Sequence, residues 1–458
     1  MQIVWFRKDL RIHDNAALTQ ACQDGPVTAV YFITPKQWQQ HDIAPIQVDF
    51  IEKSLNQLAC SLAKLGIPLI IETVDFFSDV PEKLAYLCQK LNASEVLANC
   101  EVEIDEINRD IKVQQQGIDL KLFQSDCIIN PGGVLTQQGT MFKVFTPFKL
   151  NWLKQIKALD LRPYRKPTYN NITIGKDALI DIIPTVTSIS LPKKDSSAWE
   201  ASEDAAQAHL IAFLDERAED YDLCRDFPAK PGTSMLSPYL ALGLISAKQC
   251  LHALLQRYPD SLDNAKNGPS TWVNELVWRE FYRHIMVLNT RLGRGANYNE
   301  LGNDIKWQND PILFKAWCEG KTGYPLVDAA MQQLIQTGWM HNRLRMVCAS
   351  FLTKHLLIDW RWGERFFKQH LIDGDFASNN GGWQWAASTG CDAQPYFRIF
   401  NPIIQSQKFD PNGQFISIYN QALAHLSDKQ IHFPVNPIVE HKLARLTALD
   451  LFSVLKKG

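Results

Sequence analysis

The chain has 458 residues, of which 46% are hydrophobic and 21% are charged, and its formal net charge is −2. One hydrophobic core rarely covers a chain of this length, so two or more domains are expected. The balanced charge excludes a strongly basic protein, although a local basic patch would still suit a polyanionic partner.

Cysteine and histidine usage indicates a reduced, metal-free protein. The ten cysteines are scattered singly and form no CxxC motif, which is typical of intracellular proteins. The eleven histidines form no HExxH motif, so no metal site is predicted. The N-terminus, MQIVWFRKDL, becomes charged too early for a signal peptide, and no apolar run would span a bilayer. We expect a cytoplasmic protein without membrane contacts.

The first 130 residues alternate between short apolar runs and helical patterns. The clearest helical pattern, Val48–Leu65, has apolar residues three and four apart and ends at Gly66. Runs typical of strands are Ile3–Phe6, Val27–Ile33, Pro68–Ile71, Val96–Asn99 and Leu120–Phe123. This alternation predicts an α/β domain with a doubly wound parallel sheet, whose ligands bind beyond the carboxyl ends of the strands.

The turn after the first strand, FRKDLRIHDN, contains no glycine. It therefore lacks the GxGxxG pattern that brings backbone against a pyrophosphate, and an ordinary NAD or FAD site is not expected in this domain.

The rest of the chain divides into a linker and a helical domain. Residues 131–204 show a looser pattern, and the segment Thr185–Glu203 is rich in serine, threonine and charge, as expected of an interdomain connector. Helical periodicity dominates residues 205–458, which predicts an all-α domain.

Nine of the thirteen tryptophans fall between Trp272 and Trp385. A large aromatic core is one explanation. In TWVNELVWREFYRH, however, one helical face of roughly 100° combines aromatic and charged side chains: Trp272, Glu275, Trp278, Arg279 and Tyr282. This mixture favours a cavity wall, on which a flat ligand stacks and a few polar groups orient it.

A second mixed face occurs in GWMHNRLRMV, where Asn342, Arg345 and Met346 follow i, i+3 and i+4 spacing. Met346 beside these polar residues is more typical of a pocket wall than of a core. For Arg345 the alternative is a structural role as the partner of a carboxylate at a helix end.

Polar residues also precede an apolar helical run in the segment that begins at Gly232. Thr233, Ser234 and Ser237 suggest a Ser/Thr N-cap, and the helix start would in addition suit a phosphate. Arg225 and Lys230, just upstream, could meet a polyanion.

These segments together resemble the photolyase/cryptochrome family. The resemblance covers nearly the whole chain and is densest from Tyr221 to Pro402. It rests on VWFRKDLRIHDNAAL, RDFPAKPGTSMLSPYLALG, WVNELVWREFYRHI, KTGYPLVDAAMQQLIQTGWMHNRLRM, LIDWRWGERFF and DGDFASNNGGWQWAASTGCDAQPYFRIFNP. The fold that it implies, an α/β domain linked to a helical FAD-binding domain, agrees with the periodicity.

The resemblance implies that the helical domain binds FAD in its reduced form, FADH−. Asn379 matches the residue that faces flavin N5, where a neutral amide supports the anionic reduced flavin. The FAD contacts implied are Tyr221, Thr233, Ser234, Met235, Leu236, Ser237, Trp272, Arg345, Asp373, Gly374, Asp375 and Asn379.

The resemblance also implies repair of cyclobutane pyrimidine dimers in DNA. Excited reduced flavin donates an electron to a dimer flipped out of the duplex, the ring splits, and the electron returns. Trp383, Trp360 and Trp307 match the electron-transfer chain that reduces the flavin, and with Glu275, Asn342 and Asn379 they make up the implied catalytic set. The DNA contacts implied are Arg225, Glu275, Trp278, Arg279, Asn342, Met346, Trp385 and Gln405.

Two positions indicate the subclass. Enzymes that repair (6-4) photoproducts use two histidines where this chain has Asn342 and Met346, the pattern of class I cyclobutane-dimer photolyases. The alternative is a flavin photoreceptor, a cryptochrome, that signals through a partner. We expect a monomer whose partner is damaged DNA.

A second, antenna chromophore is implied between the two domains. His41, Asp42 and Asp105 match positions around the folate site of the family, and Glu106 matches the carboxylate that binds the pterin. Gly293-Arg294 replaces the usual Cys-Lys pair. The resemblance thus favours 5,10-methenyltetrahydrofolate, with a deazaflavin or no antenna as alternatives.

The segment DGDFASNNGGWQWAAS combines these roles. We expect Asp373 and Asp375 to position the FAD, with Asp373 paired to Arg345. On a helix, Trp383 and Trp385 would point about 200° apart, so that one could serve electron transfer and the other could stack on damaged DNA.

Overall fold

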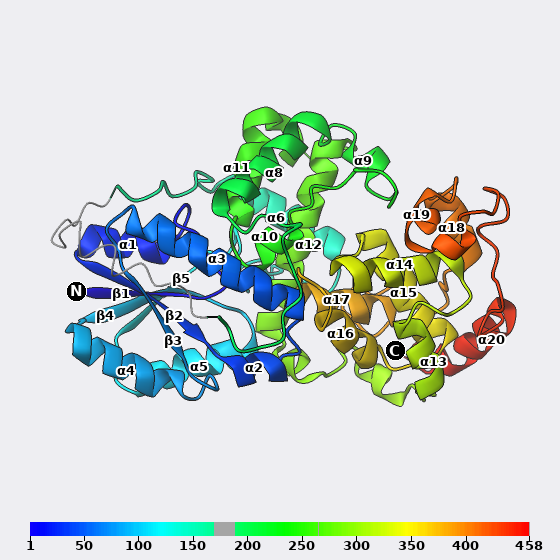
Figure 1. The fold of residues 1–458 in the computed structure, drawn as a ribbon, viewed down its shortest axis with the longest axis horizontal. Coiled ribbons are helices and arrows are strands. Elements are labelled where there is room, and N and C mark those ends of the chain that lie inside the picture. The colour runs from blue at the N-terminus through cyan, green and yellow to red at the C-terminus, as the bar shows by residue number, and fades with distance from the viewer. Residues whose placement is uncertain (169–187, 264, 458) are drawn as a thin grey trace.

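The computed structural model describes residues 1–168, 188–263 and 265–457. Residues 169–187 of the predicted linker, which include the start of the connector Thr185–Glu203, lie outside the described residues. The molecule is elongated, with a sheet-containing half at the N-terminus and a helical half towards the C-terminus (Figure 1).

The N-terminal half is a parallel sheet in the order β3-β2-β1-β4-β5. Its strands are β1 (Gln2–Phe6), β2 (Val27–Ile33), β3 (Leu69–Thr73), β4 (Glu95–Asn99) and β5 (Leu120–Phe123). All five lie within two residues of the predicted runs, and the predicted doubly wound α/β domain is confirmed. β1 lies at the centre and pairs with β2 from Gln2↔Val27 and with β4 from Gln2↔Glu95.

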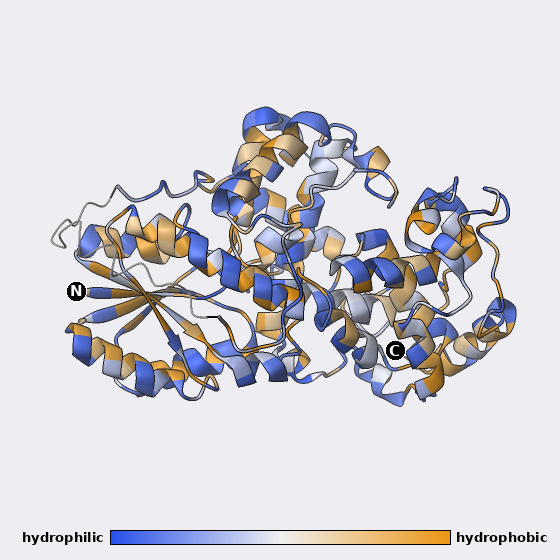
Figure 2. Ribbon diagram, viewed as in Figure 1, coloured by the Kyte–Doolittle hydropathy of each residue, from blue (hydrophilic) through white to orange (hydrophobic). Residues whose placement is uncertain are grey.

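Side-chain alternation along the strands builds two cores, one on each face of the sheet. Val4 and Phe6 point into the core beneath α1 (Ala16–Asp24) and α3 (Pro45–Ala63). Trp5 points into the opposite core, beneath α4 (Val80–Leu91) and α5 (Ile104–Gln115). Figure 1 shows these helices covering the two faces, and Figure 2 shows orange and blue alternating along them, as expected when one side of each helix is buried.

The predicted helix Val48–Leu65 corresponds to α3, which begins three residues earlier at Pro45. A short helix, α2 (Pro35–Gln40), precedes it. The segment predicted as a linker contains a helix that the sequence analysis missed, α6 (Phe145–Ile156), which packs against α12 (Gly268–Leu288). Its buried side chains Phe145, Phe148, Trp152 and Ile156 recur at three and four, but over too short a span to stand out.

The C-terminal half is helical, as predicted. Its second large core is built mainly from α14, α15, α16 and α17. The α-helices are α8 (Glu203–Glu216), α9 (Tyr221–Cys224), α10 (Ser237–Ala241), α11 (Ala247–Arg257), α12 (Gly268–Leu288), α13 (Pro311–Cys318), α14 (Pro325–Thr337), α15 (Asn342–Ser350), α16 (Trp360–Lys368), α17 (Phe376–Ala386), α18 (Pro402–Phe409), α19 (Gln414–Tyr419) and α20 (His441–Leu451).

Shorter helical segments connect these helices. A π-helix, η4 (Phe351–His355), continues α15, and 3-10 segments are η1 (Pro259–Leu262), η2 (Thr290–Arg294), η3 (Glu300–Asp304), η5 (Gln421–Leu423) and η6 (Phe452–Lys457). Within the described part of the chain, none of the helices combines the length and the apolar character that crossing a bilayer requires.

Candidate functional site

The mixed face predicted on α12 is present only in part. Trp272 is buried at its N-terminal end, where its ring packs 5.0 Å from that of Phe213. Glu275, Trp278 and Tyr282 are partly exposed, whereas their neighbours on the opposite side of the helix are buried. Part of the predicted face is therefore accessible, whereas Trp272 belongs to the core.

Two ion pairs link the residues that follow α9 to α12 and to α15. Arg225, which follows α9, pairs with Glu275 on α12, and its neighbour Asp226 accepts a hydrogen bond of 2.8 Å from Arg343 on α15. About a third of each side chain of the Arg225–Glu275 pair is accessible. Burial of the carboxyl raises the pKa of Glu275, although Arg225 acts in the opposite direction.

Trp278 is supported from behind by the linker. Its ring stacks on Phe145 of α6 with 3.6 Å between centroids and 1° between planes. Tyr282 packs one turn further along, where a Cβ on Gly381 of α17 would come within 2.1 Å of its ring. Gly381 thus makes room for an aromatic side chain of α12.

Arg279 is directed towards Asp126 rather than towards the partly exposed side chains Glu275 and Trp278. Its guanidinium donates to the backbone carbonyl of Asp126 at 2.6 Å and pairs with the Asp126 carboxylate. Arg283, one turn later, bridges Asp126 and Asp375, at 2.7 Å from the latter. Burial alone would raise the pKa of Asp126, but the two guanidinium groups hold it at about 2. The same arginines hold the pKa of Asp375 well below its usual range.

The face predicted on α15 is also present. Asn342 is exposed at the first position of the helix, and Arg345 and Met346 are partly exposed. The Arg345 guanidinium donates to both carboxylate oxygens of Asp373, at 3.0 and 2.7 Å, which confirms the predicted pair. Asp373 itself is buried, so this bond satisfies a carboxylate that water reaches only poorly.

Helix α18 carries Gln405, whose side chain is partly exposed. The Arg343 guanidinium lies 4.4 Å from the ring centroid of Phe409, the last residue of α18. Gln405 therefore belongs to a helix that contacts α15.

The expected Ser/Thr N-cap before α10 is wrong. The helix begins at Ser237, its N-cap is Leu236, and no side chain caps it. The reason is the backbone of Met235, whose positive φ of 55° turns the chain, so that Ser237 enters the helix instead of preceding it. Thr233 and Ser234 lie in the turn before it, and the hydroxyl of Ser237 accepts a hydrogen bond of 3.3 Å from the Trp339 indole.

Helix α17 carries several of the predicted site residues. Asp375 caps its start by accepting a hydrogen bond of 2.8 Å from the backbone N–H of Ser378. The Asn379 amide donates to the carbonyl of Glu364 at 2.9 Å, and Asn380 donates to the Glu364 carboxylate at 2.8 Å. Burial raises the pKa of Glu364 to about 7.

The three tryptophans of the implied electron-transfer chain differ in burial. Trp383 and Trp360 are fully buried, and Trp307 is partly exposed. The Trp360 indole donates to Asn297 at 2.9 Å, and Trp307 packs edge-on against Phe452. Trp385 is partly exposed on the same helix as Trp383, as its 200° offset predicted.

A cavity of about 530 Å³ lies between the two halves, a size typical of small-ligand sites. Of the predicted cofactor residues, Gly374, Asp375, Asn379 and Glu106 line it. Its aromatic wall is formed by Trp5, Tyr31, Phe32 and Phe77, in or just after the carboxyl ends of strands, and by Trp38 of α2; a parallel sheet binds ligands at this edge.

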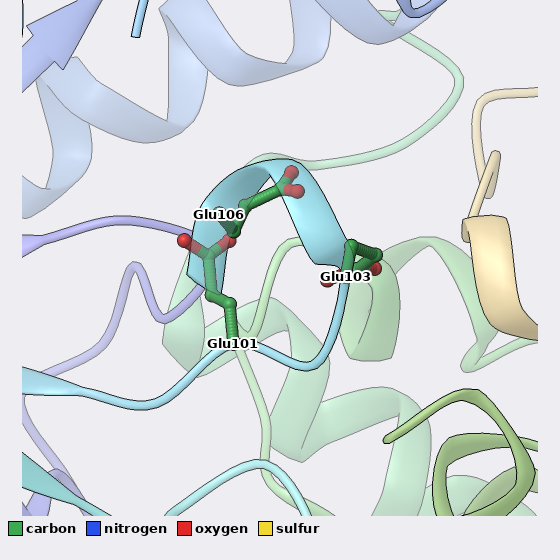
Figure 3. Close-up of side chains that lie close together, drawn as sticks. All are labelled: Glu101, Glu103 and Glu106. Carbon is green, nitrogen blue, oxygen red and sulfur yellow. The ribbon is translucent and has the colours of Figure 1, made fainter. Parts of the chain in front are cut away.

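Three glutamates of the segment after β4 gather at this cavity: Glu101, Glu103 and Glu106 (Figure 3). The Lys8 ammonium lies 3.7, 3.3 and 3.3 Å from them. The protein thus supplies a cation among these carboxylates. Burial raises the pKa of Glu103 to about 7 in spite of Lys8, and one oxygen of the buried Glu106 has no hydrogen-bond partner in the protein.

The other residues matched to an antenna site line the same cavity. Asp105 lies 3.2 Å from His41 and 2.6 Å from Arg294, which lower its pKa against the effect of burial. Asp42 pairs with Arg365 of α16 at 3.1 Å. Gly293 packs against Ile104, which a Cβ would approach to 2.8 Å.

Sequence reasoning missed Lys8, Glu103, Asp126, Arg283 and Glu364. A signal was available for the first and the third, because both follow strands at the carboxyl edge of the sheet. Arg283 follows Arg279 by one turn, a spacing that allows one carboxylate to bind both.

Comparison with known proteins places the chain in a family. Residues 2–168 match the family model described as DNA photolyase, and residues 272–452 match that described as the FAD binding domain of DNA photolyase. The deoxyribodipyrimidine photo-lyase of Vibrio cholerae is 47% identical, with both chains covered completely. The chain therefore belongs to the DNA photolyase family.

Solved structures agree with this assignment. A bacterial class III photolyase from Agrobacterium tumefaciens has a TM-score of 0.86 and 35% identity, with 100% of this chain and 98% of that chain covered. An archaeal photolyase from Sulfolobus tokodaii, solved with two FAD molecules, has a TM-score of 0.80 and 28% identity, with 99% and 100% covered.

Proposed function

We propose that this protein is a deoxyribodipyrimidine photo-lyase, which repairs cyclobutane pyrimidine dimers in DNA with light. The observation that carries the proposal is the partly exposed side of α12, where the Arg225–Glu275 pair lies one turn from Trp278 and where the Asp226–Arg343 pair links the segment after α9 to α15, which begins at Asn342. It combines an aromatic ring with hydrogen-bonding groups on partly accessible side chains. A flipped dinucleotide needs both.

The residues of the chain act on the dimer by binding and orientation. Stacking on Trp278 and Trp385 offsets the cost of flipping by roughly 1–3 kcal/mol per base. Burial raises the pKa of Glu275, against the effect of Arg225, and in its protonated form this carboxyl would donate a hydrogen bond to a base carbonyl that gains negative charge. Asn342 supplies a neutral amide from the facing helix.

The flavin would be held in the helical half, and the residues present fit it. The Asn379 amide uses its N–H to bind the Glu364 carbonyl, which leaves its oxygen to accept a hydrogen bond from a reduced flavin ring. Arg345–Asp373 and Asp375 fix the backbone around this position. When bound, FADH− supplies the electron that light drives into the dimer.

Trp383, Trp360 and Trp307 would return the flavin to its reduced form by passing electrons inwards from the surface. Their burial supports this role, since two indoles are shielded from water and the third reaches it. Arg279, held by Asp126, would act on DNA only indirectly, by positioning α12.

The cavity between the halves would hold the antenna chromophore, with 5,10-methenyltetrahydrofolate as the first candidate. The unpartnered oxygen of Glu106 supports this proposal, because a pterin offers the N–H groups that a buried carboxylate lacks here. The aromatic wall and the volume also suit a tricyclic deazaflavin or flavin. The absorption spectrum of the native holoprotein distinguishes these chromophores.

The test of the proposed function uses purified protein, its flavin reduced chemically, and an oligonucleotide that contains a cyclobutane dimer. Blue light is expected to restore the absorbance of the separated pyrimidines, and a dark sample provides the control. A photoreceptor would leave the dimer intact, and that result would contradict the proposal.

The protein would work as a cytoplasmic monomer. All ten cysteines are unpaired in the structure, which suits a reducing compartment. Sedimentation with and without dimer-containing DNA tests the oligomeric state.

A further inference from the structure

A second row of aromatic rings leads from Trp383 to the surface. The Trp317 ring centroid lies 6.1 Å from that of Trp383, and Phe314 stacks 6.0 Å from Trp317 at 19°. Trp362 meets Phe314 edge-on at 5.1 Å. Trp317 is fully buried, whereas 36% of Trp362 is exposed. The row therefore connects a buried indole to solvent through rings in contact.

This row parallels the chain of Trp383, Trp360 and Trp307. Both begin at Trp383, pass through a fully buried tryptophan and end at a more accessible one. Trp360 and Trp362 are two residues apart on α16, so their side chains point about 200° apart. One helix thus carries a member of each row on roughly opposite sides.

The surroundings of the two buried indoles differ in charge. The Arg361 guanidinium lies 4.6 Å from the centroid of the Trp360 ring, although Asp359 pairs with it at 3.0 Å. A cation in this position opposes the removal of an electron from the ring. Both indoles donate their N–H to a carbonyl oxygen, Trp360 to Asn297 at 2.9 Å and Trp317 to the backbone of Cys348 at 3.2 Å, but among the described residues no cation lies over the Trp317 ring. A carbonyl dipole favours positive charge on the indole.

We propose that Trp317 and Trp362 form a second electron-transfer route between Trp383 and the surface, beside the route through Trp360 and Trp307. The two routes are called the second exit and the first exit, because along them the oxidised state that light leaves on Trp383 moves to the surface. This inference rests on the electron-transfer part of the proposed function. Trp317 gives an electron to oxidised Trp383, and Trp362 then gives one to oxidised Trp317 across Phe314, which bridges the two and is not itself oxidised. Trp362 loses its indole proton to water and becomes a neutral radical. A thiol returns one electron and one proton to it.

The test measures photoreduction of the oxidised flavin in blue light with dithiothreitol, not repair. Trp307→Phe closes the first exit and is expected to leave a residual rate. Adding Trp362→Phe should lower that residual rate by roughly tenfold. Phe314→Leu, which removes the bridging ring, should have a similar effect. Phe366→Leu is the control for loss of an aromatic ring near the row, because Phe366 also contacts Trp317 and Phe314 but is not one of the three rings Trp317, Phe314 and Trp362.

A second readout locates the radical directly. Trp307→Phe protein is illuminated without thiol, digested and analysed by mass spectrometry, with oxygen addition expected at Trp362. An unmodified Trp362, or equal rates in Trp307→Phe with and without Trp362→Phe, would overturn the second exit alone. Unchanged photoreduction in Trp383→Phe would overturn both exits together, whereas dimer repair by chemically reduced protein tests the photolyase proposal separately.

Discussion

The two halves of the molecule bury charge in different ways. At the carboxyl edge of the sheet, cations and carboxylates form one continuous network that opens on the cavity: Arg7, Lys8, Arg109, Glu101, Glu103, Glu106 and Asp110. In the helical half, one cluster of Arg279, Arg283 and Asp375 is joined through Asp126, but other buried charges stand in isolated pairs, such as Arg345–Asp373, or alone, such as Glu280.

This difference predicts how each half tolerates a mutation. A network redistributes protons and partners when one member is lost, because several groups share each charge. An isolated pair has no such reserve, since the remaining charge stays buried without a partner. Four predictions test this comparison.

The largest effect is expected for Arg345→Ala. The substitution leaves the buried Asp373 carboxylate without its guanidinium, which should lower the free energy of unfolding by about 3 kcal/mol and weaken flavin retention. Chemical denaturation and flavin absorbance measure these effects. Arg365→Ala, at the exposed pair with Asp42, is the matched control and should cost less than about 1 kcal/mol. Equal losses of unfolding free energy in Arg345→Ala and Arg365→Ala would contradict the special cost of breaking a buried, isolated pair.

Glu280 should make stability depend on pH. It is fully buried and accepts hydrogen bonds from the Trp152 indole, at 2.6 Å, and from the backbone of Ile128. Burial raises its pKa from 4.5 to about 7. Between these values the folded protein holds a proton that the unfolded chain releases, so this contribution to stability is present below 4.5 and is lost as the pH rises through 7.

The size of this contribution is on the order of 3 kcal/mol. Glu280→Gln removes it, so the difference in unfolding free energy between the variant and the wild type should change across this range, in favour of the variant at higher pH. A pH-independent difference would show that the carboxyl is ionised throughout.

A smaller effect is expected from Glu275→Ala. Flavin should stay bound, and the quantum yield of repair by pre-reduced protein should fall, because one hydrogen bond to the dimer, worth about 1 kcal/mol, is lost. Glu275→Gln retains an N–H donor and should recover part of the yield. Flavin loss in Glu275→Ala would instead indicate a structural role for the Arg225–Glu275 pair.

The smallest effect is expected for Lys8→Met. Burial raises the pKa of Glu103 to about 7, and Lys8 opposes this shift. Removing the ammonium should therefore raise the pKa of Glu103 further, so that this carboxyl takes up a proton at higher pH than before. Thermal unfolding near pH 6 should therefore change little, and the loss should grow above pH 7. A large loss at pH 6 would show that Lys8 acts as half of an isolated pair.

Periodicity alone predicted much of this fold. The strands and α3 follow from alternation and from spacing at three and four, because these patterns depend only on neighbours along the chain. The same reasoning found the mixed face of α12. The Arg345–Asp373 pair was predicted from the interpretation of Arg345 as a possible partner of a carboxylate at a helix end.

The rest depended on contacts between distant segments. The resemblance implied a DNA contact for Arg279, and its pairing with Asp126 was not predicted because Asp126 lies 153 residues earlier in the chain. The N-cap prediction was wrong because Met235 adopts a positive φ. The sequence gives no sign of this conformation, because the residue is not a glycine. The need for glycine at position 363 is explained only by a contact in the folded protein, because a Cβ there would come within 2.1 Å of the Trp383 ring.

The ion pairs of Arg283 have a consequence for how ligands exchange. They tie Asp126, after the last strand, to Asp375, at the start of α17, and so fasten the sheet to the helical half beside the cavity. A hinge motion that opened the cavity would have to break these buried pairs. A chromophore bound in this cavity, as proposed above, would then enter and leave through the existing mouth, so we expect slow exchange, with any such pigment retained through dilution and gel filtration.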